Sequence, residues 1–123
     1  MLQERSYVQV ADNTGASVVM LFSVTGKNNR KSVGVGQIVR GSVKKSKPQA
    51  KIKKTEIVSI LIVRTRKKIT RKDGSSIKFS DNAGVIVNKN NGEPMGTRVF
   101  GPIAREIKEL GFNKVASLAE EVL

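Results

Sequence analysis

The chain has 123 residues and carries 23 lysine and arginine side chains against 10 aspartate and glutamate side chains, a formal net charge of +13. Histidine and cysteine are both absent, which excludes disulfides, thiol nucleophiles, Cys/His zinc sites and imidazole acid–base chemistry. The acidic residues form no suggestive cluster, so we expect no catalytic site, metal site or cofactor. The length predicts a single domain over residues 1–123.

The positive charge is concentrated in one part of the sequence. Residues 27–78 hold 17 basic and 2 acidic side chains, whereas the other residues hold 6 basic and 8 acidic ones. A contiguous positive field of this size indicates a surface that binds a polyanion. A solvated surface that only maintains solubility is disfavoured, because self-repulsion would destabilise an isolated fold. Membrane binding is disfavoured because the basic segment has no amphipathic helical stripe, and residues 1–10 show no secretory signal.

The N-terminal part predicts three strands. Alternating apolar residues indicate a first strand at 7–11 with one wet face. A turn over 12–15 is expected from its Asp, Asn and Gly residues, and a largely apolar second strand follows at 16–25. The glycines of 34–36 favour a bend over a phosphate-binding loop, because the strand, helix and Lys-Ser/Thr pair of a P-loop are missing. The third strand is expected at 37–43.

Residues 44–54 carry six lysines, one proline and no acid. A segment of this composition cannot bury a core, so it is predicted to be a mobile basic loop or ribbon tip that RNA binding would order.

An apolar run at 57–63 predicts a strand that is buried on both faces. Basic residues follow it without a break, and Asp73-Gly74 indicates a hairpin turn that leads into a strand through Ile77 and Phe79. A last strand is expected around Val85. Six short strands favour a mainly-β fold with a small closed barrel. Lysines suit phosphates as point charges and arginines can fork onto them, so the candidate phosphate contacts are Lys44, Lys45, Lys47, Lys51, Lys53, Lys54, Arg64, Arg66, Lys67, Lys68, Arg71 and Lys72.

The C-terminal quarter predicts two short helices. The first is expected to start at Pro102, where proline loses no needed hydrogen bond, and the second to be capped by Asn113. Both are about two turns long and must dock on the barrel to persist. Their packing and C-capping residues are expected to be Ile103, Ile107, Leu110, Gly111, Val115 and Leu118.

The few aromatic residues bear on an alternative function. A free-standing single-strand RNA binder of the OB or cold-shock type would display aromatic rings beside exposed basic residues on a strand face. Phe22 and Phe79 lie within strand patterns and are expected in the core. No aromatic cluster of that kind is expected, and an enzymatic function is disfavoured by the missing His and Cys.

The sequence also resembles a known family along almost its whole length. Residues 10–16, with the sequence VADNTGA, resemble the N-terminal signature of the universal large-subunit ribosomal protein family numbered fourteen. Residues 63–65 with the following Asp-Gly turn match as well, and residues 96–102, GTRVFGP, are the most distinctive match. Gly84 departs from the family pattern, in which a small residue, often Cys, is usual, and so does Glu120, where Pro is usual.

The resemblance implies a five-stranded barrel over about residues 1–90 with a projecting β-ribbon, then a loop and two small helices over about 91–123. It implies a structural constituent of the large ribosomal subunit that binds large-subunit rRNA and lies beside other ribosomal proteins. It further implies contact with small-subunit rRNA at inter-subunit bridges, in a bacterial cytoplasmic or an organellar ribosome. A ribosome-silencing factor would dock at Thr97, Arg98 and Lys114. The structural alternative for Arg98 is an ion pair with an acid such as Glu106.

Overall fold

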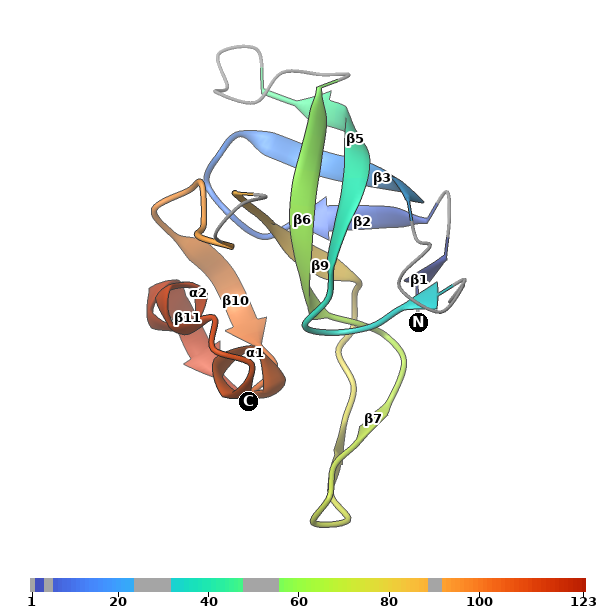
Figure 1. Cartoon of the computed structure of the whole chain (residues 1–123), viewed down its shortest axis with the longest axis vertical. Coiled ribbons are helices and arrows are strands. Elements are labelled where there is room, and N and C mark those ends of the chain that lie inside the picture. Colours follow the sequence, from blue (N-terminus) through green and yellow to red (C-terminus); the bar gives the residue numbers. More distant parts are fainter. Residues whose placement is uncertain (1, 4–5, 24–31, 48–55, 89–91) are drawn as a thin grey trace.

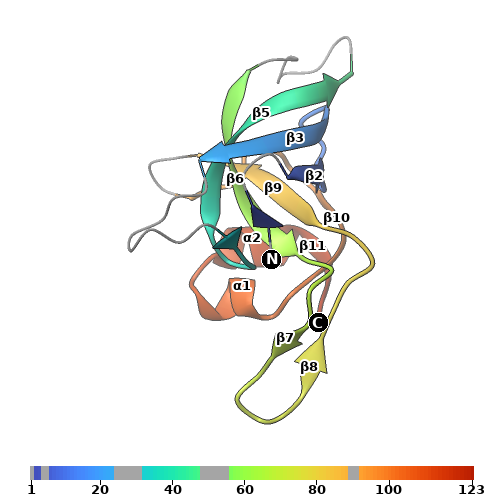
Figure 2. The same ribbon diagram turned by 90° about the vertical axis from the view of Figure 1, so that its right-hand side faces the viewer.

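The computed structural model describes residues 2–3, 6–23, 32–47, 56–88 and 92–123. Its strands form a closed barrel, from which a hairpin and a C-terminal layer extend (Figures 1 and 2). The barrel strands are β2 (Tyr7–Val10), β3 (Ala16–Ser23), β5 (Ile38–Ser46), β6 (Ile57–Arg64) and β9 (Ala83–Val87). They neighbour one another in that order, and the parallel pairing of β2 with β9 closes the ring. The predicted five-stranded barrel is confirmed.

Strand β6 is the central element of the fold because both of its faces are covered. It pairs with β5 on one side and with β9 on the other. Since strand side chains alternate between faces, Val58, Ile60 and Ile62 enter the core inside the barrel, whereas Leu61 and Val63 enter a second core under the C-terminal layer. Each such side chain contributes roughly 1.5–3 kcal/mol on burial. The prediction of a strand buried on both faces is confirmed, except that its first residue is exposed.

Gly84 of β9 shows why a small residue stands at this position. A Cβ added there would lie 2.6 and 2.7 Å from the Cγ1 and Cδ1 atoms of Ile60. Because Ile60 is fully buried inside the barrel, it could not move away without displacing its neighbours. The glycine therefore makes room for the larger side chain of β6.

A small second sheet precedes β5. Its strands β1 (Leu2–Gln3) and β4 (Ser32–Val33) pair antiparallel. The chain then bends, as predicted, and Gly36 adopts a φ of +89° that favours glycine. The Gly36 amide donates to the carbonyl oxygen of Ile62 over 2.8 Å, which fixes the bend against β6.

The predicted hairpin projects from the barrel, and residues 66–80 are called the ribbon here (Figures 1 and 2). Strands β7 (Ile69–Thr70) and β8 (Ser76–Ile77) pair antiparallel across its turn. The Asp73 carboxylate accepts hydrogen bonds from the Ser75 amide at 2.9 Å and the Ser75 hydroxyl at 2.6 Å, and these bonds lower the Asp73 pKa. Gly74 adopts a φ of +89°. The Asp-Gly turn prediction is confirmed.

The C-terminal layer combines two helices with a parallel strand pair. Strands β10 (Val99–Ile103) and β11 (Ala119–Val122) are joined by α1 (Glu106–Glu109) and α2 (Asn113–Leu118). Their apolar side chains pack on the outer face of β6 and β9, so the second core joins barrel and layer. Within the described ranges, no helix is long and apolar enough to span a membrane.

Three predictions for this layer are wrong. Pro102 lies in β10 and not at a helix start, because β10 pairs in parallel with β11, a long-range contact that leaves no local pattern. Asn113 is the first residue of α2 and not its cap, which is Phe112. Leu110 is exposed, because α1 ends before it. The predicted packing of Val115 is confirmed, as it is fully buried.

The prediction that Phe22 and Phe79 lie in the core is also wrong, since both are half-buried. Leu21 occupies the barrel interior, so its neighbour Phe22 points to the outer face. There the Arg40 guanidinium lies 5.8 Å from the centre of the Phe22 ring, a cation–π contact. An aromatic ring and a strand cation therefore do meet on this surface, contrary to the prediction.

Candidate nucleic-acid interface

The first lysines of the predicted basic loop belong to a strand. Strand β5 continues through Ser46, so that Lys45 lies opposite Val18 of β3. The Lys47 amide then donates to the carbonyl oxygen of Gly15 over 2.9 Å. The expectation of a loop from residue 44 is thus corrected, because β5 continues through Ser46 and β3 pairs with Lys45 and Ser46. Lys51, Lys53 and Lys54 lie outside the described residues.

Most of the ribbon cations face water. Lys67, Lys68 and Lys72 are exposed, and so is Arg66 at the root of the ribbon. The Arg66 Nε donates to the carbonyl oxygen of Ser80 over 3.0 Å. Its two terminal nitrogens have no protein partner in the part of the chain that the structure describes. They can therefore donate hydrogen bonds to a phosphate without breaking a protein contact.

Arg64 differs, because its guanidinium joins the barrel to β10. Its Nη1 donates to the carbonyl oxygens of Phe100 at 3.2 Å and Pro102 at 3.3 Å, and its Nη2 donates to the Asp81 carboxylate at 3.3 Å. Its Nε lies 3.2 Å from the other Asp81 oxygen, which makes an ion pair without the alignment of a hydrogen bond. Arg64 is half-buried, and its donors bind protein acceptors that hold the barrel against β10.

Arg71 is likewise engaged within the protein. Its Nε donates to Glu106 Oε1 over 2.7 Å, and its Nη2 donates to the carbonyl oxygen of Leu123 over 2.8 Å. Burial alone would raise the Glu106 pKa, but the hydrogen bond and the charge of Arg71 leave that pKa lowered. The Glu106 hydrogen bond also raises the Arg71 pKa. The ribbon is therefore fastened to α1 and to the last residue of the chain.

Thr97 and Arg98 form an exposed turn that Asn13 holds. The Asn13 Oδ1 accepts hydrogen bonds from the Thr97 amide at 2.8 Å and the Arg98 amide at 3.3 Å, and its Nδ2 donates to the Thr97 hydroxyl at 2.7 Å. A Cβ on Gly96 would lie 2.6 Å from Asn13 Oδ1, so a glycine permits this approach. Sequence reasoning missed the role of Asn13, because the contact spans 84 residues.

The three residues predicted to dock a silencing factor, Thr97, Arg98 and Lys114, differ in their side-chain contacts. Arg98 is exposed and has no side-chain partner among the described residues, and Glu106, its proposed acid, is paired with Arg71 instead. The structural alternative for Arg98 is therefore wrong in its named partner. Lys114 of α2 lies 3.7 Å from the Glu93 carboxylate, an exposed ion pair that links α2 to the segment leading into the turn.

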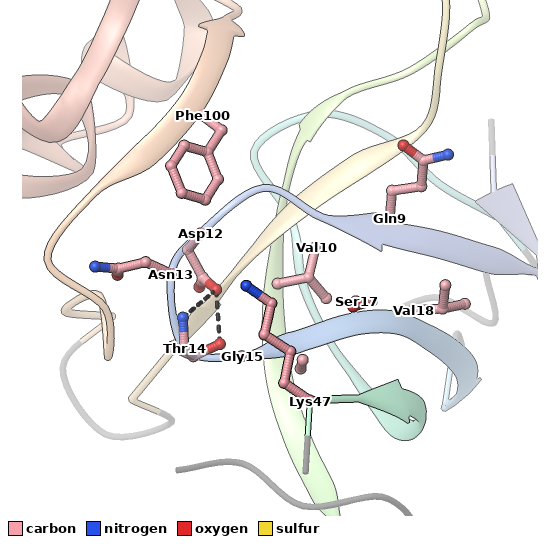
Figure 3. Close-up of a pocket in the computed structure, with 11 residues that line it drawn as sticks. Gln9, Val10, Asp12, Asn13, Thr14, Gly15, Ser17, Val18, Lys47 and Phe100 are labelled. Carbon is pink, nitrogen blue, oxygen red and sulfur yellow. Dashed lines mark hydrogen bonds between the residues drawn. The ribbon is translucent and has the colours of Figure 1, made fainter. Parts of the chain in front are cut away.

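A cavity of about 700 Å³ lies beside the 12–15 turn (Figure 3). Asp12 lines it but is buried, and its carboxylate accepts hydrogen bonds from the Thr14 hydroxyl at 2.7 Å and the Ile86 amide at 2.9 Å. Burial raises the Asp12 pKa despite these bonds. Phe100 stands on one side of the turn and Lys47 on the other. No local sequence pattern indicates this cavity, because three segments that are distant in the sequence form it.

Comparison with known protein families shows which family the chain belongs to. A family model described as ribosomal protein L14p/L23e matches residues 1–123, the whole of the chain. The chain belongs to the ribosomal protein L14p/L23e family. It is thus a structural protein of the large ribosomal subunit and a part of the translation machinery, not a member of an enzyme family.

The structure relates two of the L14p/L23e sequence matches, residues 10–16 and 96–102, to each other. The first contains Asn13 and the second contains the 96–98 turn, and the Asn13 amide joins them directly. The two departures from the family pattern are accommodated. Gly84 fits beneath Ile60, and Glu120 is exposed in β11. The C-terminus is fixed without a proline there, because β11 pairs with β10 and Arg71 binds Leu123.

Proposed function

We propose that the chain binds large-subunit rRNA through the exposed cations of the ribbon and of the end of β5. The observation that carries this proposal is the difference between the basic side chains. Two of the predicted arginines are occupied within the protein, whereas the other described cations of the set are exposed, except Lys44, which is half-buried. The proposed phosphate contacts among the described residues are Lys44, Lys45, Lys47, Arg66, Lys67, Lys68 and Lys72.

Arg64 and Arg71 have a different part in this proposal. Both guanidinium groups have protein acceptors, and removing them would leave those acceptors without their donors. They hold the root of the ribbon against β10 and α1, so that the exposed cations approach RNA from a fixed position. Lys51, Lys53 and Lys54 stay in the proposed set because of their charge and their place in the sequence.

A competition experiment tests the proposal. The protein is bound to large-subunit rRNA, challenged with an excess of bulk structured RNA at several salt concentrations, and followed by footprinting. A single protected site that survives the competitor is expected. Diffuse protection that the competitor removes would leave only general binding to RNA, because contacts to phosphates alone carry no sequence information.

The second part of the proposal concerns the 96–98 turn and Lys114. We propose that this surface faces the small subunit, contributes to bridges with its rRNA and docks a ribosome-silencing factor in a bacterial or organellar ribosome. The proposal follows the family resemblance, and the exposed Arg98 on a turn held by Asn13 supports it. Neighbouring large-subunit proteins are the other expected partners.

We further propose that residues 1–123 fold as one domain. Support comes from the second core, in which Leu61 and Val63 of the barrel pack with Ile103, Ile107 and Val115 of the C-terminal layer. A layer that shares a core with β6 is expected to unfold together with the barrel in one transition.

A further inference from the structure

The cavity beside the 12–15 turn has an aromatic wall that the fold does not use. Phe100 is 44% exposed although its strand neighbours Val99 and Ile103 are buried. Its backbone is fixed on both sides, because its amide donates to the carbonyl oxygen of Ala11 over 2.6 Å and its carbonyl oxygen accepts from Arg64. A ring with a fixed backbone and an open face is a platform on which a planar group can stack.

The opposite side of the cavity supplies a positive charge. The Lys47 backbone is held against Gly15, and its exposed side chain lines the cavity (Figure 3). Asp12 is the only acidic residue in the described lining, and it is 4% exposed with both carboxylate oxygens already hydrogen bonded. The Lys47 ammonium is therefore left for an anion from outside the protein.

The two walls belong to segments that are held together in the absence of a partner. The three Asn13 hydrogen bonds fasten the 12–15 turn to the 96–98 turn, from which β10 and Phe100 follow directly. Binding would thus require little ordering of the chain, and pre-organisation of this kind favours affinity. The volume of about 700 Å³ lies within the range of roughly 300–1,000 Å³ that is typical of small-ligand sites.

We propose that this cavity holds one unpaired nucleotide of ribosomal RNA, with its base stacked on Phe100 and its phosphate bound by Lys47. An aromatic face beside one cation complements a nucleotide, which has a planar base next to an anion. An apolar protein side chain could also cover Phe100, but it would provide no anion to pair with the Lys47 ammonium. The inference rests on the proposed rRNA binding and adds a base contact to the phosphate contacts of the ribbon.

Ultraviolet crosslinking of the unmodified protein tests the stacking directly. Large subunits and joined ribosomes are irradiated separately, so that the two samples distinguish a nucleotide of large-subunit rRNA from one of small-subunit rRNA. Trypsin cleaves after Arg98 and Arg105 and releases the peptide 99–105, which contains Phe100. A nucleotide adduct on Phe100 in either sample is expected. Ribosomes that contain the protein but yield no such adduct, or an adduct to another protein, would overturn the proposal.

Matched variants test the two roles in ribosomes that carry the variant as the only copy. Phe100→Ala is expected to raise the chemical reactivity of one rRNA base by roughly 5- to 100-fold, because stacking is lost, and Phe100→Tyr to keep that base protected. Lys47→Gln is expected to expose the same base, whereas Lys45→Gln and Tyr7→Ala, which alter a neighbouring lysine and an exposed ring outside the cavity, are not. Unchanged reactivity with Phe100→Ala would contradict the inference.

The proposed function and this inference fail in distinguishable ways. If the protein does not bind rRNA through its basic surface, the footprint of the unaltered protein on large-subunit rRNA is missing. If only the inference is wrong, that footprint is present while the Phe100 adduct is absent and the Phe100→Ala variant leaves every base unchanged.

Discussion

The Arg71 guanidinium donates to the Glu106 carboxylate over 2.7 Å and thereby connects the ribbon to helix α1. One cation of the basic ribbon is therefore used for a contact within the protein. The same arginine also binds the carbonyl oxygen of Leu123, so three separate segments meet at a single side chain. The contact therefore ties the ribbon to the C-terminal layer.

The Arg71–Glu106 contact predicts an acid-sensitive contribution to stability. The pKa of Glu106 is lowered in the folded protein, so the contribution is present above the unfolded-state pKa of glutamate, about 4.3, and is lost as pH falls through the lower folded-state pKa. Urea unfolding should show Glu106→Gln to be less stable than the unaltered protein at pH 7, with the difference shrinking in acid. Glu120→Gln, which removes an exposed carboxylate of β11, is the control and should leave the stability at pH 7 within about 0.5 kcal/mol of the unaltered protein. A pH-independent difference would contradict the assignment.

The contact between Gly84 and Ile60 predicts that β9 does not tolerate a larger residue. Gly84→Ala should lower the free energy of unfolding by about 1–3 kcal/mol, the usual effect of overpacking a core. Ile60→Val removes the Cδ1 atom that the new methyl group would meet. The double variant should therefore be more stable than the sum of the two single changes predicts. Strict additivity in denaturant unfolding would show that the two residues do not compete for space.

Arg64 and Lys68 should separate stability from RNA binding. Arg64→Ala leaves the Phe100 and Pro102 carbonyl oxygens without their donor, and we expect a loss of about 1–3 kcal/mol in unfolding free energy. Lys68→Ala should leave stability within about 0.5 kcal/mol but weaken rRNA binding and reduce its salt slope by about 1. Thermal unfolding and filter binding measure the two effects. A stable Arg64→Ala protein with a reduced salt slope would reassign Arg64 to the RNA surface.

Arg98 should affect partners rather than the fold. Arg98→Glu is expected to leave unfolding and rRNA binding unchanged, because its side chain has no partner among the described residues. Subunit joining or silencing-factor docking should weaken roughly tenfold or more, as for the loss of one charged hydrogen bond. Arg105→Glu makes the same charge change at another exposed site and serves as the control. Loss of rRNA binding or of folding by Arg98→Glu would show that the residue is structural.

The features that could be predicted from the sequence are those with a local cause. The continuous apolar run of β6 and the Asp73-Gly74 turn both follow from neighbouring residues, and both are confirmed. The parallel pairing of β10 with β11 joins segments that meet only in the folded chain, so the local pattern around Pro102 predicts a helix start where the structure has a strand. The acceptors of Arg64 and Arg71 are likewise distant in the sequence, so no local pattern predicts these contacts. Sequence alone therefore identified the basic residues but could not separate those that hold the fold from those that face outward.

The salt dependence of rRNA binding tests the central claim most directly. If the ribbon and the end of β5 neutralise about six to ten phosphates, affinity for large-subunit rRNA should fall by about 10³- to 10⁵-fold between 50 and 200 mM salt. A variant with Arg66, Lys67, Lys68 and Lys72 changed to alanine should show a slope reduced by up to about four. Affinity that hardly changes with salt, or a variant slope equal to that of the unaltered protein, would contradict an rRNA surface built from these cations.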